Sequence, residues 1–187
     1  MAAIDLYRVG FVMLEKALTT GIDILQKAKA APDASELPKA RLAPDMFDLR
    51  GQVEVFHLTA AKLVYELGNP LSRKTPDPVT DMALWAVPQG EAATLDDLIA
   101  HLERARELVK GVPAADVEGK QDQRVQLDTA LGSWDLSATE YVANFVVPNA
   151  FFHLQTSYAI LRHRGVPLGK RDFLVPFIGP PAPQPSN

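Results

Sequence analysis

The sequence predicts an all-α protein, a four-helix bundle with a short β-hairpin before the last helix. Three observations favour this class. Four segments carry apolar residues at helical spacing. Prolines interrupt the chain between the first and second and between the second and third of these segments. One later stretch alternates apolar with polar residues. A single helix cannot bury such an apolar stripe alone, and four helices packed around one core are the simplest arrangement that does.

The first two helices are predicted over residues 3–31 and 45–67. Pro32 follows the first, and Gly68, a residue common at helix ends, follows the second. Each segment has a continuous apolar face. The faces consist of Tyr7, Phe11, Leu14, Leu18, Ile22 and Leu25 in the first helix, and of Met46, Leu49, Val53, Phe56, Ala60, Leu63 and Leu67 in the second.

The third predicted helix begins at Thr94 and has Asp96 and Asp97 in its first turn, where the helix dipole favours acids. His101 falls opposite much of the apolar stripe, so we expect its side chain to be exposed and not to be a ligand. The stripe consists of Leu95, Leu98, Ile99, Leu102, Ala105 and Leu108.

Two stretches are predicted to lie outside the helices. Residues 68–93 are rich in proline, and Trp85 suggests a contact with the body of the protein. A cover over one end of the bundle and a plain packed loop both fit this stretch. In residues 112–136, Val125 and Leu127 alternate with polar residues, which favours a short β-hairpin or another extended segment.

The last helix is predicted over residues 137–165. Ser137 and Glu140 have the spacing of a capping box, and Gly165 suits the left-handed position after the last turn. Pro148 removes one backbone hydrogen bond, so it either kinks this helix or starts a second helix after a break. Residues 166–174 are expected to form a packed turn.

The last helix carries a row of polar side chains in an otherwise apolar segment. Asn149, His153, Thr156 and His163 lie three or four residues apart, together with Ile160, and so share one face. A buried polar group without a partner costs about 1–3 kcal/mol. These groups therefore either bond to one another and to neighbouring helices, or bind a ligand.

His57 lies on the second helix in a row with Val53, Ala60 and Val64, at the border of the apolar face. A histidine tethered in the core and a histidine that takes part in a site both fit this position.

Composition limits the classes of function. The chain has 187 residues, no cysteine and a net charge of −4, which excludes disulfides and thiolate metal sites and gives no basic field for nucleic acid. The basic residues from Arg162 to Arg171 fit a solvated helix end. No apolar run reaches the roughly 20 residues needed to cross a bilayer, and no secretion signal is visible. We expect a soluble cytoplasmic protein with no nucleic-acid or membrane partner.

Three motifs carry a resemblance to a known family. They are Leu-Ala-Pro-Asp-Met-Phe at residues 42–47, Pro-Asn-x-x-x-His at residues 148–153, and the run from Tyr158 to Asp172, which contains Tyr-Ala-Ile-Leu-Arg-His and Gly-Val-Pro-Leu-Gly-Lys. Together they resemble the signature of an uncharacterised bacterial and fungal family of the DinB/YfiT-like superfamily. The resemblance implies a four-helix bundle domain over residues 1–175, often dimeric, followed by a proline-rich tail over residues 176–187.

The resemblance also implies a site. Many members of the superfamily hold a divalent metal with three histidines, one on the second helix and two spaced His-x-x-x-His on the fourth. Aligned on the Leu-Arg-x-x-Gly end of the last helix, these positions become His57, Asn149 and His153. Asparagine at the second position departs from the pattern, because an amide oxygen is a poor ligand for zinc or nickel.

Two functions follow from these residues. The first is a bundle that binds a small ligand or has no enzymatic role, with His57, Asn149 and His153 at a degenerate metal position. The alternative is a divalent-metal-dependent enzyme such as a thiol S-transferase, in which the metal, zinc or nickel, would activate a thiol or water. The resemblance also leads us to expect a homodimer.

Overall fold

The computed structural model describes residues 5–68, 93–129 and 132–179. Most of the predicted connection at 68–93, with Trp85, therefore lies outside the described residues. So do residues 180–187 of the predicted tail.

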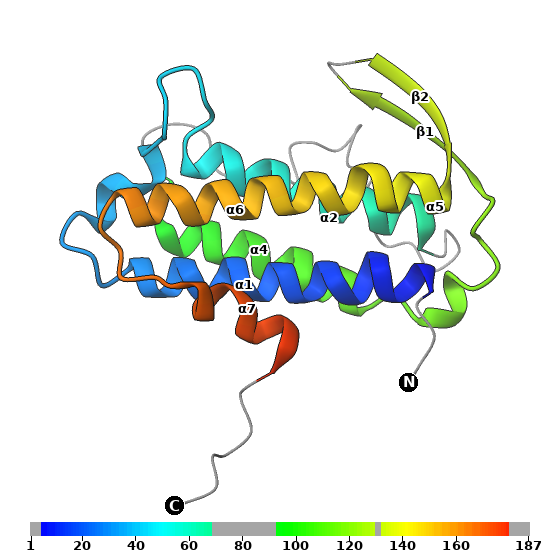
Figure 1. The fold of residues 1–187 in the computed structure, drawn as a ribbon, viewed down its shortest axis with the longest axis horizontal. Coiled ribbons are helices and arrows are strands. Elements are labelled where there is room, and N and C mark those ends of the chain that lie inside the picture. Colours follow the sequence, from blue (N-terminus) through cyan, green and yellow to red (C-terminus); the bar gives the residue numbers. More distant parts are fainter. Residues whose placement is uncertain (1–4, 69–92, 130–131, 180–187) are drawn as a thin grey trace, which may run out of the picture.

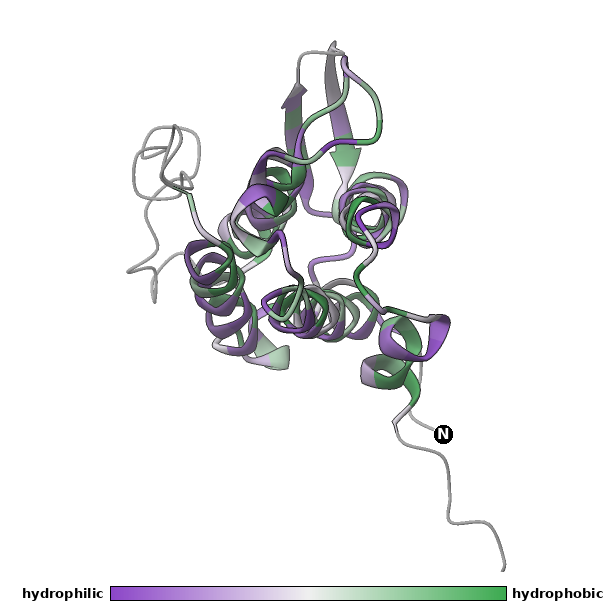
Figure 2. Ribbon diagram, turned by 90° about the vertical axis from the view of Figure 1, so that its left-hand side faces the viewer, coloured by the Kyte–Doolittle hydropathy of each residue, from purple (hydrophilic) through white to green (hydrophobic). Residues whose placement is uncertain are grey.

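Four long helices form the body of the protein: α1 (Met13–Ala28), α2 (Leu49–Leu67), α4 (Leu95–Lys110) and α6 (Val147–His163). Helix α1 packs against α4 and α6, and α2 packs against the same two helices, so that each has two neighbours. Figures 1 and 2 show the four running side by side around one centre. The prediction of a mainly helical fold is confirmed.

The core lies between these helices and is apolar. The largest fully buried side chains come from α1, α2 and α4 and from shorter segments of the chain, and they include Phe11, Phe56, Leu18, Leu63, Leu102 and Tyr141. Helix α6 contributes the buried residues Ala150, Leu154, Ile160 and Leu161. Among the described residues, the buried polar side chains all lie on the four long helices: Thr20, Gln52, His57, Thr59, His101, His153, Thr156 and Ser157. No helix among the described residues combines the length and apolarity needed to cross a membrane.

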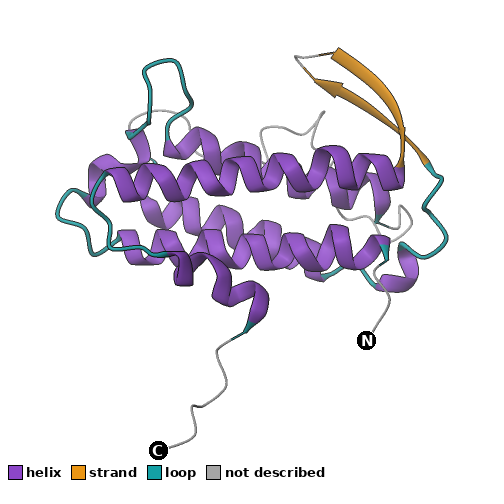
Figure 3. Cartoon of the chain, viewed as in Figure 1, coloured by secondary structure: helices purple, strands orange, loops and turns teal. Residues whose placement is uncertain are grey.

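Shorter elements add to the four long helices, so the described part of the chain holds more helices than predicted. They are the π-helix η1 (Arg8–Val12), the 3₁₀-helices η2 (Ala34–Lys39) and η4 (Ala114–Asp116), the short helix α5 (Ala138–Tyr141), the π-helix η5 (Val142–Val146) and the helix α7 (Lys170–Ile178). Figure 3 shows that the rest of the described chain consists of two strands and loops.

The predicted hairpin is present. Strand β1 (Arg124–Thr129) pairs antiparallel with β2 (Gly132–Ser137), and Leu127 lies opposite Trp134. Paired residues share a face, so Leu127 and Trp134 lie on the same side of the ribbon. The hairpin leads directly into α5, where Ser137 and Glu140 form the predicted capping box.

The helix that contains Pro148 is continuous but changes its hydrogen-bonding pattern. From Ala138 to His163 the chain passes through α5, η5 and α6, and the backbone of Val146 and Val147 stays helical. The amide of Val147 bonds to the carbonyl of Val142, five residues back. A π turn of this kind accommodates a proline in the next position without breaking the helix. Gly165 ends α6 with a φ of 83°, as predicted.

Residues 166–174 were predicted to form a packed turn, and this is partly wrong, because Lys170–Ile178 form the helix α7. The helix extends three residues into the predicted tail. It is held against α1 by hydrogen bonds from Lys16 Nζ to the carbonyl of Phe177 and from Thr20 Oγ1 to the carbonyl of Phe173. Asp172 satisfies the free amide of Gly169 at its start, a local signal that the sequence did contain.

Tyr141 offers a test of the core. Its side chain is fully buried, and its hydroxyl makes no hydrogen bond to any described residue. Removing an unsatisfied hydroxyl removes its desolvation cost, which is about 1–3 kcal/mol. We therefore expect Tyr141→Phe to leave the free energy of unfolding in urea unchanged or to raise it. The half-buried Tyr7 gives the control, Tyr7→Phe. A loss of more than about 1 kcal/mol in Tyr141→Phe would show that the hydroxyl has a partner.

Candidate functional site

The polar row of the last helix faces α2. His153 Nδ1 lies 2.7 Å from Gln52 Oε1, and Asn149 Nδ2 lies 2.7 Å from Thr59 Oγ1. Gln52 and Thr59 are seven residues apart, two turns of α2, and so share the face that meets α6. Two side-chain hydrogen bonds therefore join the two helices at what we call the α2–α6 seam, defined by these four residues.

Gln52 has a fixed orientation at the seam. Its side-chain nitrogen donates to the backbone carbonyl of Phe47 at 3.2 Å, and its oxygen faces His153. The opposite orientation of the amide would bring two oxygens together. The oxygen can only accept, so Nδ1 of His153 must carry the proton and donate it. In neutral histidine the other ring nitrogen, Nε2, then carries the lone pair.

Thr59 imposes the same kind of order on Asn149. Its hydroxyl donates to the carbonyl of Val55 at 2.8 Å and accepts the amide N–H of Asn149. The amide oxygen Oδ1 of Asn149 thus remains as an acceptor. Within the described residues, no hydrogen bond reaches Asn149 Oδ1 or His153 Nε2. The seam therefore presents two acceptor atoms on successive turns of α6.

Burial decides the charge of His153. The residue is 6% exposed, and desolvation lowers the pKa of its imidazole to about 4. The ring is therefore neutral at physiological pH. Phe152 stands beside it, with ring centroids 5.2 Å apart in an edge-to-face arrangement, and is itself 58% exposed. An acceptor on a mostly buried imidazole thus lies next to an exposed aromatic ring.

His57 is tethered in the core, between α2 and α4. It is 1% exposed, and its Nδ1 lies 2.9 Å from the backbone carbonyl of His101. The carbonyl accepts, so Nδ1 of His57 carries the proton. Burial lowers the pKa of His57 to about 4, with a smaller contribution from the positive charge of Arg104. His57 was open to two interpretations, a histidine tethered in the core or one that takes part in a site. Its described contacts are those of a histidine tethered in the core.

The prediction that His101 is exposed is wrong. His101 is fully buried, and its ring stacks on that of His57 with centroids 3.8 Å apart. The physical reason is that α4 packs against both α1 and α2, so its buried arc is wider than one apolar stripe. The exposed Arg104 donates from Nη2 to His101 Nδ1 at 2.9 Å. The buried imidazole thus has a hydrogen-bond partner whose positive charge lies at the protein surface.

The described contacts place the three predicted site residues in two groups. Asn149 and His153 meet α2 at the α2–α6 seam, whereas His57 packs against α4. At about 100° per residue, His57 lies about 140° from Gln52 and about 160° from Thr59 around the axis of α2. Within the described residues, no three histidine, aspartate or glutamate side chains are grouped so that they could hold a metal ion.

The exposed face of α2 carries a pocket of about 400 Å³ next to the seam. It is lined by Phe47, Gly51, Val55 and Leu58, with charged residues around them. A Cβ on Gly51 would lie 3.0 Å from the Cβ of Phe47, so glycine at this position permits Phe47 to pack close to α2. Because Gln52 bonds to the carbonyl of Phe47, this pocket and His153 are linked through one side chain.

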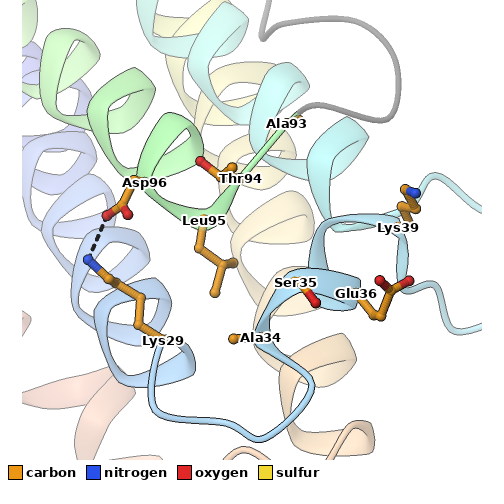
Figure 4. A pocket seen from close by; sticks show the side chains of 9 residues that line it. All are labelled: Lys29, Ala34, Ser35, Glu36, Lys39, Ala93, Thr94, Leu95 and Asp96. Atoms are coloured by element: carbon orange, nitrogen blue, oxygen red, sulfur yellow. Dashed lines mark hydrogen bonds and ion pairs between the residues drawn. The ribbon is translucent and has the colours of Figure 1, made fainter.

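A second pocket of about 460 Å³ lies at an end of the bundle, where η2 approaches the start of α4. Figure 4 shows the ion pair between Lys29 and Asp96 at its edge, with Glu36 and Lys39 on the other side. The charges here comprise two lysines and two acids, so they balance each other. The amides of Thr94 and Asp97 at the start of α4 are satisfied by the capping box. None of the predicted site residues lines this pocket.

Sequence reasoning missed Gln52, Thr59 and His101. A spacing of seven residues between two polar side chains on the apolar face of α2 was a signal for Gln52 and Thr59. No comparable signal marked His101, because its burial depends on which helices become neighbours.

Two of the buried histidines, His57 and His153, make stability depend on pH. An unfolded histidine has a pKa near 6.5, whereas His57 and His153 protonate near pH 4. Between these values the unfolded chain binds more protons, so the free energy of unfolding falls as pH falls from about 6.5 to 4, by roughly 3 kcal/mol for each residue. Urea unfolding across this range should show the loss.

His153→Gln should remove about half of this pH dependence, because His57 remains. His163→Gln, at the exposed end of α6, serves as the control and should leave it unchanged. Equal pH dependence in all three proteins would contradict the burial of a neutral His153.

Comparisons with known proteins agree with this fold. A family model described as a domain of unknown function, DUF1993, matches residues 6–174. A crystal structure of a DinB family member from Shewanella denitrificans is similar to this chain with a TM-score of 0.69 and 28% identity, over 90% of this chain and 91% of that one. No protein with curated annotation matches the chain. Because the family model covers most of its length, the chain belongs to the DUF1993 family of domains of unknown function.

Proposed function

We propose that this bundle binds a small organic ligand at the α2–α6 seam. The observation that supports this is the pair of acceptor atoms, Asn149 Oδ1 and His153 Nε2, which the partners on α2 leave without a hydrogen bond to any described residue. Both side chains are already ordered by their other hydrogen bonds. A ligand therefore meets a site that is organised before binding, which lowers the entropic cost of association.

The surroundings of these two acceptors define the class of ligand. Two acceptors call for a ligand that donates hydrogen bonds, such as an amide, an amine or a hydroxyl compound. The exposed ring of Phe152 beside His153 favours an apolar or aromatic part in the same ligand. A neutral imidazole neither repels a cationic donor nor attracts an anion, so anionic ligands are disfavoured relative to these compounds.

The metal alternative requires His57, Asn149 and His153 to share one ion. One feature of the donors suits a metal: His57 and His153 each donate Nδ1–H to an oxygen, which leaves the lone pair on Nε2. The placement of the donors does not suit it, because His57 packs on α4 and lies about 140° around α2 from the partner of His153. The residues as arranged do not fit a shared metal, and we derive no thiol-transfer step from them.

The similar proteins support the fold of this chain and do not bear on ligand binding at the seam. The family is one of domains of unknown function, and the similar solved structure is described only as a DinB family member. Homodimerisation and a cytoplasmic location stay predictions from the sequence.

Benzamide, which combines an aromatic ring with amide N–H donors, provides a probe for the site. We expect it to shift the NMR signals of the His153 ring in a saturable manner, with a dissociation constant in the millimolar range that is typical of so small a compound. Phe152→Ala should weaken binding several-fold. Ile178→Ala, which removes an exposed apolar side chain on α7, serves as the control and should bind as the wild type does. A linear, non-saturable response in the wild type would contradict the proposal.

Metal content tests the alternative. We expect elemental analysis of the untagged protein to find zinc or nickel far below one equivalent, because Asn149 and His153 provide one strong ligand between them. Asn149→His creates two imidazoles one turn apart, a spacing that chelates zinc, so this variant should gain metal. Asn149→Gln is the matched control and should not. One equivalent of zinc in the wild-type protein would show that His57, Asn149 and His153 do converge.

A further inference from the structure

Gln52 is the buried side chain that contacts His153, and its surroundings leave it no alternative orientation. It is 2% exposed, its nitrogen donates to the carbonyl of Phe47, and its oxygen lies 2.7 Å from His153 Nδ1. The carbonyl of Phe47 accepts hydrogen bonds only. The backbone carbonyl of Phe47, just before α2, therefore orients the amide of Gln52, and the amide oxygen in turn orients the imidazole of His153 on α6.

The other described contacts of His153 do not set the position of its proton. The Phe152 ring stands perpendicular to the imidazole and offers no hydrogen bond that could select one ring nitrogen. Ser157 donates to the backbone carbonyl of His153 and does not reach its ring. Among the described residues, Gln52 is thus the one hydrogen-bond partner of the imidazole.

We infer that Gln52 is a positioning residue that holds His153 in the tautomer with the proton on Nδ1 and the lone pair on Nε2. In free neutral histidine the proton prefers Nε2, so without Gln52 the ring would present a donor where the site presents an acceptor. The tautomer itself follows from the hydrogen bonds. Its role in selecting ligands that donate hydrogen bonds rests on the function proposed above.

Proton position decides which ligands His153 recognises. With the lone pair on Nε2, the ring and Asn149 Oδ1 are both acceptors and select the same kind of partner. With the proton on Nε2, the two groups would make opposite demands of a ligand, and the site would lose this selectivity. Gln52 also links this choice to Phe47, which lines the neighbouring pocket.

The tautomer can be read directly from long-range ¹H–¹⁵N correlation spectra of the full chain at neutral pH, because protonated and unprotonated ring nitrogens resonate far apart. His153→Gln identifies the signals of His153. In the wild-type protein, with no ligand added, we expect Nδ1 to be protonated and Nε2 unprotonated. In Gln52→Met, which keeps the length of the side chain and removes the acceptor, the His153 signals should move toward the tautomer protonated on Nε2.

Two further variants complete the experiment. Gln52→Glu keeps an acceptor oxygen and should keep Nδ1 protonated, which provides a test even where Gln52→Met does not fold. Gln155→Met makes the same change on an exposed residue two positions from His153 and should leave the spectrum unchanged. A wild-type His153 protonated on Nε2, or a folded Gln52→Met with unchanged His153 signals, would overturn the inference.

The proposed function is tested separately. The spectra are recorded without ligand, so the expected tautomer combined with no saturable benzamide binding would refute only the proposed function. Saturable benzamide binding by a His153 that is protonated on Nε2 would refute only the role of Gln52.

Discussion

The side-chain hydrogen bond between Gln52 and His153 is the interaction on which the candidate site depends. It joins α2 to α6 inside an otherwise apolar core, where an unpaired imidazole or amide would be costly. The same bond orients the histidine and sets its proton. The hydrogen bond between Thr59 and Asn149 repeats the arrangement one turn along α6. The hydrogen bonds that satisfy these side chains thus also fix the positions of two acceptor atoms, Asn149 Oδ1 and His153 Nε2.

Sequence patterns predicted the parts of this structure that depend on local chemistry. Helical stripes, the Ser137–Glu140 cap, the left-handed Gly165 and the alternation in β1 are all set by residues close in the chain, and each is confirmed. The polar row with Asn149 and His153 was predicted for the same reason. The partners of that row were not, because they depend on how α2 and α6 align, which no local pattern encodes.

The error at His101 and the placement of His57 have one cause. A helix with two neighbours buries two arcs, and the residues on the second arc look exposed when only the main stripe is considered. His57 and His101 lie on those second arcs of α2 and α4 and stack on each other. The alignment with the superfamily's metal site assigned His57 by its position along α2, whereas its direction around the helix axis decides what it meets. The family likeness therefore predicts the fold of this chain, whereas the chemistry of its site stays a prediction.

A double-mutant cycle between Gln52 and His153 tests the central claim most directly. The free energy of unfolding would be measured for the wild type, Gln52→Met, His153→Leu and the double variant. If the two side chains stabilise the seam through one buried hydrogen bond, the coupling energy should be about 1–2 kcal/mol. A coupling energy near zero, with both single variants folded, would contradict the account, because the two residues would then contribute to the core independently.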